Sequence, residues 1–247
     1  MQYFGVRMLG VSIINALLMI YIFGSHISLT PIYTDATNMT FAVNNDFLIQ
    51  NTSSFIDESA IMHVYGEVKN ISNKTTTNVI VKGSFFDVDG TLLNHFQRTC
   101  ELPTVNSGGI CPFEILYIDA KTTNRVKDFK LSATGIITDE SKPTTLKIYS
   151  DNSRLDILGF YYINGRISNE GSLTATNSSV VASLYDKDGK VIAIGRALAE
   201  PVNIPSGNQA SFGMAVTEKS QTYKTKNYSL VAYSDQGVSS PLSVMSK

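Results

Sequence analysis

Residues 79–92 read VIVKGSFFDVDGTL, and residues 178–191 read SSVVASLYDKDGKV. In each stretch an alternating run leads into Asp-x-Asp-Gly, which indicates a hairpin because glycine adopts positive φ freely and aspartate hydrogen-bonds the turn backbone. A period of two predicts strands with one face in the core. The expected core residues are Val81, Gly83 and Phe85, and Val180, Ala182 and Leu184. The predicted turn residues are Asp87, Asp89 and Gly90, and Asp186, Asp188 and Gly189.

These stretches belong to a longer internal repeat with a constant offset of 99 residues. About a quarter of the positions from Gly66 to Ala133 are identical to their partners, without a gap. Matched pairs include Gly66 with Gly165, Asn70 with Asn169, Ser107 with Ser206, Gly108 with Gly207, Phe113 with Phe212 and Leu131 with Leu230. A unit of about 95 residues has the length of a domain, not of a solenoid repeat. The sequence therefore predicts one repeat at 39–138 and another at 144–238, with a short polar joint at 139–143.

The spacing of the strand-like stretches predicts the fold class. They recur about every 10–20 residues and are separated by Asp-Gly, Ser-Gly and Pro signals, which favours an all-β fold with an antiparallel sandwich in each repeat. No amphipathic helix of ordinary length is evident after residue 30. The chain has 247 residues, of which 43% are hydrophobic, enough for two cores.

The repeated pattern resembles a known family. Gly-x-Val/Ile-x-Asn, then a β-rich run ending in aromatic-Asp-x-Asp-Gly, then Ser-Gly and Phe, is similar to domains of the FxLYD type. The resemblance covers residues 66–113 and 165–212; the second copy has Leu-Tyr-Asp at 184–186, whereas the first has Phe-Phe-Asp at 85–87. It implies tandem immunoglobulin-like sandwiches in an exported or membrane-anchored prokaryotic protein. It transfers no catalytic or binding residue.

The first 30 residues are typical of a targeting segment. Residues 8–23 read MLGVSIINALLMIYIF, Arg7 precedes them, and no Lys or Arg follows until Lys69. This charge asymmetry predicts a cytoplasmic N-terminus and an exported body. The apolar run is long for a signal-peptide core and short for a membrane span, so both an uncleaved signal-anchor and a cleaved signal peptide stay open. The prediction is a cell-membrane protein with a single N-terminal helical anchor, and the alternative is a secreted protein.

The most tempting catalytic motif is the sequence FDVDGTLL at residues 86–93. It resembles the first motif of haloacid-dehalogenase-like phosphatases, in which the first Asp is the nucleophile and Mg²⁺ bridges carboxylate and phosphate. The second repeat keeps Asp-x-Asp-Gly but lacks the threonine, and the chain lacks the alternating helices of that fold. We therefore expect a turn, and a hydrolase using Asp87 and Asp89 is only a remote alternative. A weak Ca²⁺ site at either turn also stays open, although no downstream bidentate Glu is evident.

Cysteine and histidine usage indicates no catalytic or metal centre. In an oxidising compartment, Cys100 and Cys111 are expected to form a disulfide that closes a small loop. Alanines stand at both equivalent positions of the second repeat, so the fold does not need the bond, which stabilises the first repeat locally. His63 and His95 fall in predicted strands without ligand spacing. We predict no cofactor, no metal and no catalytic residue.

Several Asn-x-Ser/Thr sequences are candidate glycosylation sites on an exported body. They lie at Asn38, Asn51, Asn73, Asn177 and Asn227. A sixth, Asn70, matches Asn169 across the repeats and is interpreted as a turn residue instead.

Composition restricts the function classes. The 20 Lys and Arg are balanced by 21 Asp and Glu, which leaves no basic surface for a nucleic acid. The leading hypothesis is a non-enzymatic extracytoplasmic protein of the cell envelope that binds or scaffolds an unknown protein or glycan partner. The alternative is a secreted β-sandwich accessory subunit of an envelope complex.

Overall fold

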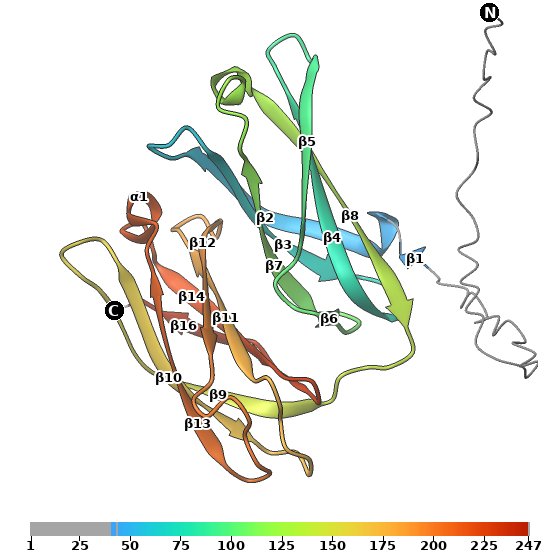
Figure 1. Ribbon diagram of the computed structural model, residues 1–247, viewed down its shortest axis with the longest axis vertical. Coiled ribbons are helices and arrows are strands. Elements are labelled where there is room, and N and C mark those ends of the chain that lie inside the picture. Colours follow the sequence, from blue (N-terminus) through green and yellow to red (C-terminus); the bar gives the residue numbers. More distant parts are fainter. Residues whose placement is uncertain (1–40, 43, 247) are drawn as a thin grey trace, which may run out of the picture. The chain divides into compact units, whose positions relative to one another are not determined.

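The computed structural model describes residues 41–42 and 44–246, and they form an almost entirely β structure (Figure 1). All of them belong to one compact unit. The strands of the first repeat are β1 (Phe41–Ala42), β2 (Phe47–Ile56), β3 (Met62–Asn70), β4 (Thr75–Phe86), β5 (Leu92–Thr99), β6 (Thr104–Val105), β7 (Ile110–Tyr117) and β8 (Asp128–Thr138). Two short 3₁₀ turns accompany them, η1 (Asn44–Asp46) and η2 (Thr123–Arg125).

The second repeat contains the remaining strands and one helical turn. They are β9 (Thr144–Leu155), β10 (Tyr161–Asn169), β11 (Ser179–Tyr185), β12 (Val191–Leu198), β13 (Gln209–Val216), α1 (Lys219–Thr222), β14 (Asn227–Tyr233), β15 (Val238–Ser239) and β16 (Leu242–Met245). No helix within residues 41–42 and 44–246 is long and apolar enough to span a membrane. The predicted N-terminal hydrophobic helix lies outside the described residues.

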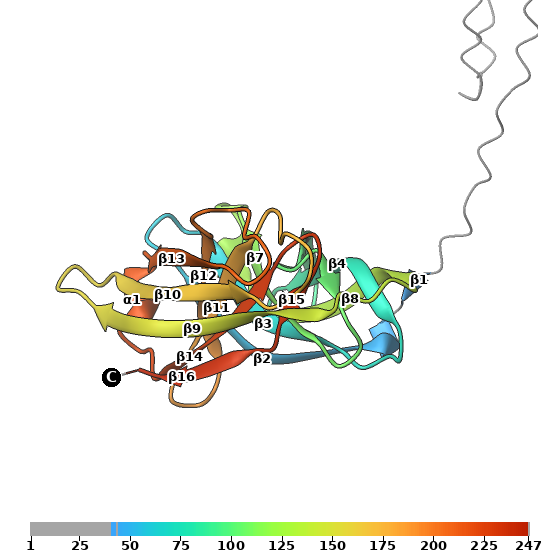
Figure 2. The same cartoon turned by 90° about the horizontal axis from the view of Figure 1, so that it is seen from below.

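Each strand pairs only with strands of its own repeat. In the first repeat, β1-β8-β4-β5 form one sheet, with β6 also paired to β4, and β2-β3-β7 form another. In the second repeat all eight strands join one sheet, in the order β12-β11-β14-β15-β9-β10-β13, with β16 also paired to β14. Figure 2 shows β9 and β10 side by side, and their antiparallel register is interrupted by one bulge. Every pairing is antiparallel except that of β15 with β9.

The 99-residue offset holds at the level of individual contacts. Gly66 pairs with Phe113 across the ladder, and Gly165 pairs in the same way with Phe212. A Cβ atom added to either glycine would lie 2.6 Å from the facing phenylalanine ring. Because no side chain fits there, the Gly and Phe of the repeated motif are needed as a pair.

Asn70 and its partner Asn169 also play the same role. Asn70 is fully buried, and its Nδ2 donates hydrogen bonds to the carbonyls of Lys74 at 2.7 Å and Val105 at 3.0 Å. Asn169 donates at 2.8 Å to the carbonyls at the equivalent positions, Leu173 and Ile204. The amide nitrogen of Asn70 is thus committed to backbone groups, which agrees with the interpretation of Asn70 as a turn residue.

The hydrophobic residues form two clusters. The expected core faces are confirmed, since Val81, Phe85, Val180, Ala182 and Leu184 are completely buried. One cluster contains only second-repeat residues. The other is built on the first repeat but also contains four aliphatic residues of the second, namely Val181, Val191, Ile194 and Val231. The first repeat's cluster therefore continues into its neighbour.

Candidate binding site at the contact between the repeats

The contact between the repeats arises because two strands are buried on both faces. Val64 and Val68 of β3 face the first repeat's own core, while Tyr65 and Glu67 point the other way and are also buried. In β11 every residue from Ser179 to Leu184 is buried. We call the contact of β2, β3 and β7 with β11, β12 and β14 the seam. Strand β12 packs directly against all three first-repeat strands, as Figure 1 shows.

Aliphatic side chains make up the apolar part of the seam. Val181 is 3% exposed, Val191 is fully buried, and Ile194 and Val231 are each 8% exposed. Fully burying a side chain of this kind contributes about 1.5–3 kcal/mol relative to leaving it in water. Four such residues on one face make the contact substantial.

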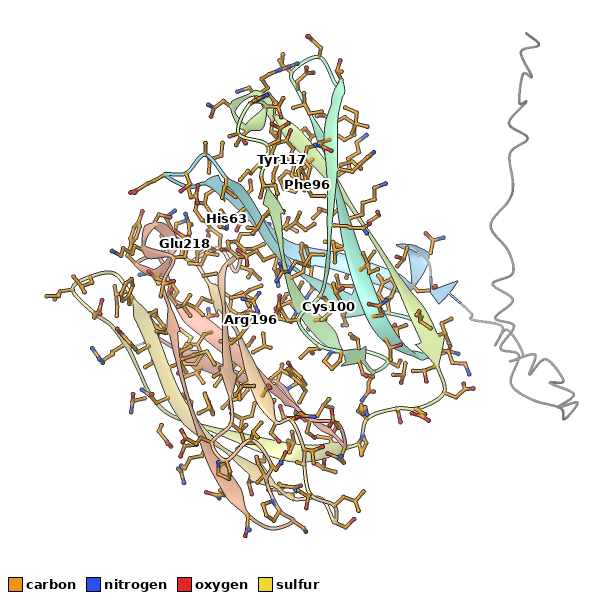
Figure 3. The ribbon with its side chains drawn as sticks, viewed as in Figure 1. His63, Phe96, Cys100, Tyr117, Arg196 and Glu218 are labelled. Carbon is orange, nitrogen blue, oxygen red and sulfur yellow. A yellow bond between two sulfur atoms is a disulfide. The ribbon has the colours of Figure 1, made fainter. Side chains whose placement is uncertain are left out.

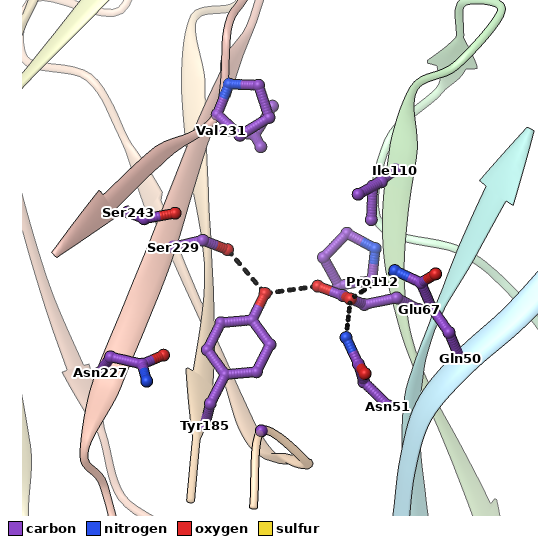
Figure 4. A pocket seen from close by; sticks show the side chains of 12 residues that line it. Gln50, Asn51, Glu67, Ile110, Pro112, Tyr185, Asn227, Ser229, Val231 and Ser243 are labelled. Carbon is purple, nitrogen blue, oxygen red and sulfur yellow. Dashed lines mark hydrogen bonds between the residues drawn. The ribbon is translucent and has the colours of Figure 1, made fainter. Parts of the chain in front are cut away.

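A buried carboxylate lies beside this apolar contact. Glu67 is 2% exposed, and Tyr185 of the second repeat donates a 2.5 Å hydrogen bond to its Oε1 (Figure 4). The amide of Asn51 donates to Oε2 at 2.9 Å, and that of Gln50 lies 3.4 Å from the same atom. The tyrosine hydroxyl has only one proton, so Ser229, at 2.9 Å, donates to the tyrosine oxygen. Burial, with the nearby charge of Glu67, raises the pKa of Tyr185.

The backbone of β2 is shaped to reach this carboxylate. The register of β2 with β3 shifts between Gln50 and Ser53, which marks a bulge. Asn51, inside the bulge, has a φ of 55°, in the left-handed region that asparagine tolerates better than most residues. The bulge lets Asn51 turn its amide towards Glu67.

A pocket of about 390 Å³ opens at this place. Its polar wall includes Asn51, Glu67, Tyr185, Asn227 and Ser229 (Figure 4). Its apolar wall is formed by Ile110, Pro112, Val231 and Pro241. The volume is within the range of small-molecule sites. Residues from both repeats line it, so the pocket exists only when the repeats are in contact.

A second polar group of the seam surrounds His63. Its Nδ1 lies 3.0 Å from Glu114, its Nε2 lies 3.4 Å from Asp57, and its ring stacks on Phe55 with centroids 4.7 Å apart. Figure 3 shows His63 near Glu218 of the second repeat. Burial lowers the pKa of His63, but the hydrogen bonds to Glu114 and Asp57 outweigh it, so the pKa is raised.

Arg196 connects this group to the second repeat. Its guanidinium donates two hydrogen bonds to Glu101 and lies 3.7 Å from Glu114. Burial opposes ionisation of Glu114, but hydrogen bonds from His63 and Tyr65, with the nearby charge of Arg196, hold its pKa below the usual range. The seam thus joins the repeats through charge as well as apolar packing.

The predicted Asp-x-Asp-Gly turns connect β4 to β5 and β11 to β12, and the two turns have the same hydrogen bonds. Asp87 Oδ1 accepts hydrogen bonds from the backbone of Asp89 at 3.1 Å and Thr91 at 3.0 Å. Asp186 Oδ1 accepts from Asp188 and Lys190, each at 2.9 Å. Gly90 and Gly189 have φ values of 77° and 73°. The other oxygen of Asp87 accepts from Arg125 at 3.0 Å, so turn and ion-pair contacts occupy both carboxylate oxygens.

Sequence reasoning missed two further turns of the same design. Asp57 accepts from the backbone of Ser59 and Ile61, and Asp156 accepts from Leu158 and Phe160. The residues three positions after these aspartates, Ala60 and Gly159, also have positive φ. The shared spacing, Asp followed three residues later by Gly or a small residue, was the available signal.

In the described part of the chain, no three His, Cys, Asp or Glu residues are placed to hold a metal ion.

The predicted disulfide is confirmed. Cys100 and Cys111 are joined with Cα atoms 5.8 Å apart. Both are buried, and alanines, also buried, replace them at Ala199 and Ala210. The bond lies next to Glu101, the partner of Arg196 in the seam.

The candidate glycosylation residues fall into different environments. Asn73 is exposed in a loop after β3. Asn177 is exposed but donates to Asp235 at 2.7 Å. Asn51 and Asn227 line the pocket, where a glycan would compete with the seam. Asn38 lies outside the described residues.

Comparisons with known proteins identify no family. No family model and no curated protein matches the chain. Among solved structures it is similar to red sea bream transglutaminase, at 9% identity over 81% of this chain and 32% of that one, with a TM-score of 0.28. It is also similar to Amycolatopsis orientalis exo-chitosanase CsxA, at 12% identity over 81% of this chain and 26% of that one, with the same TM-score. The chain spans a third or less of these proteins, and likenesses this weak identify no function.

Proposed function

We propose that this chain is a non-enzymatic binding or scaffolding protein of the cell envelope, with its body outside the cytoplasm. In this proposal, two tandem immunoglobulin-like sandwiches of the FxLYD type follow an N-terminal membrane anchor. The observation that carries the proposal is the seam, in which four aliphatic residues of the second repeat complete the hydrophobic cluster of the first. A body of two repeats with a fixed contact can present a ligand site that neither repeat has alone.

The use of the acidic residues supports a binding role. The Asp87 carboxylate is hydrogen-bonded within its turn and to Arg125, so it is not poised as a nucleophile. The buried carboxylate of Glu67 instead lies in a pocket, held by neutral donors.

Fractionation of cells that express the full chain tests the location. We expect the protein in the membrane fraction, resistant to a high-salt wash, with an intact N-terminus. The apolar segment at residues 8–23 is the reason for this expectation. A mature form that begins after about residue 24 and is free in the medium would replace the anchor with the secreted alternative.

An assay with p-nitrophenyl phosphate and Mg²⁺ tests the non-enzymatic part. We expect background hydrolysis by the wild-type chain, by Asp87→Asn and by the matched variant Asp186→Asn. Hydrolysis by the wild type that is lost in Asp87→Asn, but kept in Asp186→Asn, would establish a phosphatase and overturn the proposal.

A further inference from the structure

The pocket at the seam has one formal charge. Glu67 is the only Asp, Glu, Lys, Arg or His residue among those that line it. The carboxylate is 2% exposed, and its described hydrogen-bond donors are the phenol of Tyr185 and the amides of Asn51 and Gln50. All of these donors are neutral. A buried carboxylate without a cationic partner attracts a cation, because neutral donors compensate its lost hydration only in part.

The walls of the pocket indicate the shape of such a cation. Ile110, Pro112, Val231 and Pro241 form an apolar wall that suits an alkyl chain. The hydroxyls of Ser229 and Ser243 and the amide of Asn227 line the same pocket as the carboxylate. These groups can accept hydrogen bonds, and an ammonium group has three to donate. In Figure 4, Val231 and Ile110 lie towards one end of the pocket and Asn227 towards the other.

We propose that the seam pocket binds an aliphatic primary ammonium group, with the cation at Glu67 and the alkyl stem along the apolar wall. A free amine and a lysine side chain of a partner peptide both carry this group, and the pocket would recognise the same chemistry in either. This proposal rests on the binding role proposed above but not on the membrane anchor. An anion would be repelled by Glu67, and a neutral polyol would leave its charge unpaired.

The repeat supplies a matched control. The position equivalent to Glu67 is Arg166, which is exposed and pairs with Asp151 at 2.9 Å. Phe86 stands at the position equivalent to Tyr185, so the first repeat lacks that hydroxyl. The second repeat therefore has no copy of this site, and Arg166→Gln changes charge at an equivalent strand position without touching the pocket.

The test is a titration of the purified full chain with n-butylammonium and with N-acetyl-lysine N-methylamide, followed by the methyl NMR signals of Ile110 and Val231. We expect saturable shifts with either or both probes, and binding by the peptide-like probe alone would identify a protein lysine as the source. Glu67→Gln should weaken binding about tenfold or more, whereas Arg166→Gln should bind like the wild type. The thermal transition of each variant shows whether it is folded.

Neutral probes decide whether charge is recognised. n-Butanol and the Nε-acetylated lysine derivative should bind at least about tenfold more weakly than the ammonium probes. Raising the NaCl concentration from about 0.05 to 0.5 M should weaken ammonium binding to the wild type, which tests the charge even if Glu67→Gln fails to fold. Equal binding of n-butanol and n-butylammonium, or binding of methyl glucoside without ammonium binding, would overturn the proposal. The fractionation and phosphatase results would be unaffected.

Discussion

The outer face of β4 in the first repeat and that of β11 in the second are equivalent in the repeat but differ in surroundings. Lys82 is exposed at the centre of the β4 face, whereas Val181 at the same place on β11 is 3% exposed. Leu92 of β5 is 44% exposed, and its equivalent, Val191 of β12, is fully buried. The two repeats share a core pattern, but of these two equivalent outer faces only that of β11 lies in the seam.

The largest effect on stability is expected from exchanging the residues at these equivalent positions, Val181 and Lys82. Val181→Lys would place an ammonium group in the apolar part of the seam and should lower the free energy of unfolding by about 3 kcal/mol or more. The reverse substitution, Lys82→Val, should change it by less than about 0.5 kcal/mol. Urea denaturation of the full chain measures both. Similar small effects for the two variants would mean that the β11 face is not buried in solution.

A smaller effect is expected from the disulfide, which is present in only one repeat. Replacing both Cys100 and Cys111 by serine should cost about 2–3 kcal/mol, because the bond closes a short loop in the unfolded chain. Reduction of the wild type should have a similar effect, and adding reductant to the double variant should have none. Stability that does not respond to reduction would assign the bond no role in holding β5 and β7 together.

Next in size is the hydroxyl of Tyr185. Tyr185→Phe removes one donor from the buried Glu67 carboxylate and should cost about 1–2 kcal/mol. The matched variant, Phe86→Tyr, adds a hydroxyl at the equivalent, partly exposed position and should change stability by less than about 0.5 kcal/mol. Thermal unfolding would compare them. Equal effects would show that the Glu67–Tyr185 bond contributes nothing across the seam.

The smallest effect is the pH dependence of folding stability that arises from His63 and Glu114. The raised pKa of His63 adds stability below its ordinary value of 6.5, and this is lost as the pH rises through the folded-state value. The lowered pKa of Glu114 adds stability above 4.5, lost as the pH falls through its folded-state value. Their joint contribution is therefore greatest between about pH 4.5 and 6.5.

Substitution of His63 separates its contribution to the pH dependence from that of the other titratable groups. Asp57, Glu114 and Glu218 act on His63 and favour its charged form. His63→Gln should flatten the stability profile above pH 6.5, whereas His95→Gln, at an exposed strand position, should leave it unchanged. An unchanged profile in His63→Gln would remove this residue from the account of the seam.

The sequence predicted the features that depend on local pattern. The period of two placed Val81, Phe85 and Leu184 in the core, and the oxidising context paired the two cysteines. The burial of the polar face of β3 was not predicted. Tyr65 and Glu67 alternate with valines as a solvated face would, yet the second repeat covers them.

Partners distant in the chain explain that failure. The hydroxyl bonded to Glu67 comes from Tyr185, 118 residues away, and no local period reports such a contact. The available signal was the lack of charge in β11, whose seven residues read SVVASLY, while β4 carries Lys82 at the equivalent place. A strand without charge on either face indicates burial on both sides.

Hydrogen exchange with mass spectrometry on the full chain in increasing urea tests the central claim, that the seam couples the two repeats. We predict that β3 and β11 lose protection together in the wild type, because each buries its outer face against the other repeat. In Val181→Lys the two strands should lose protection at different urea concentrations, and in Lys82→Val they should again do so together. Separate loss in the wild type, unchanged by Val181→Lys, would contradict the account.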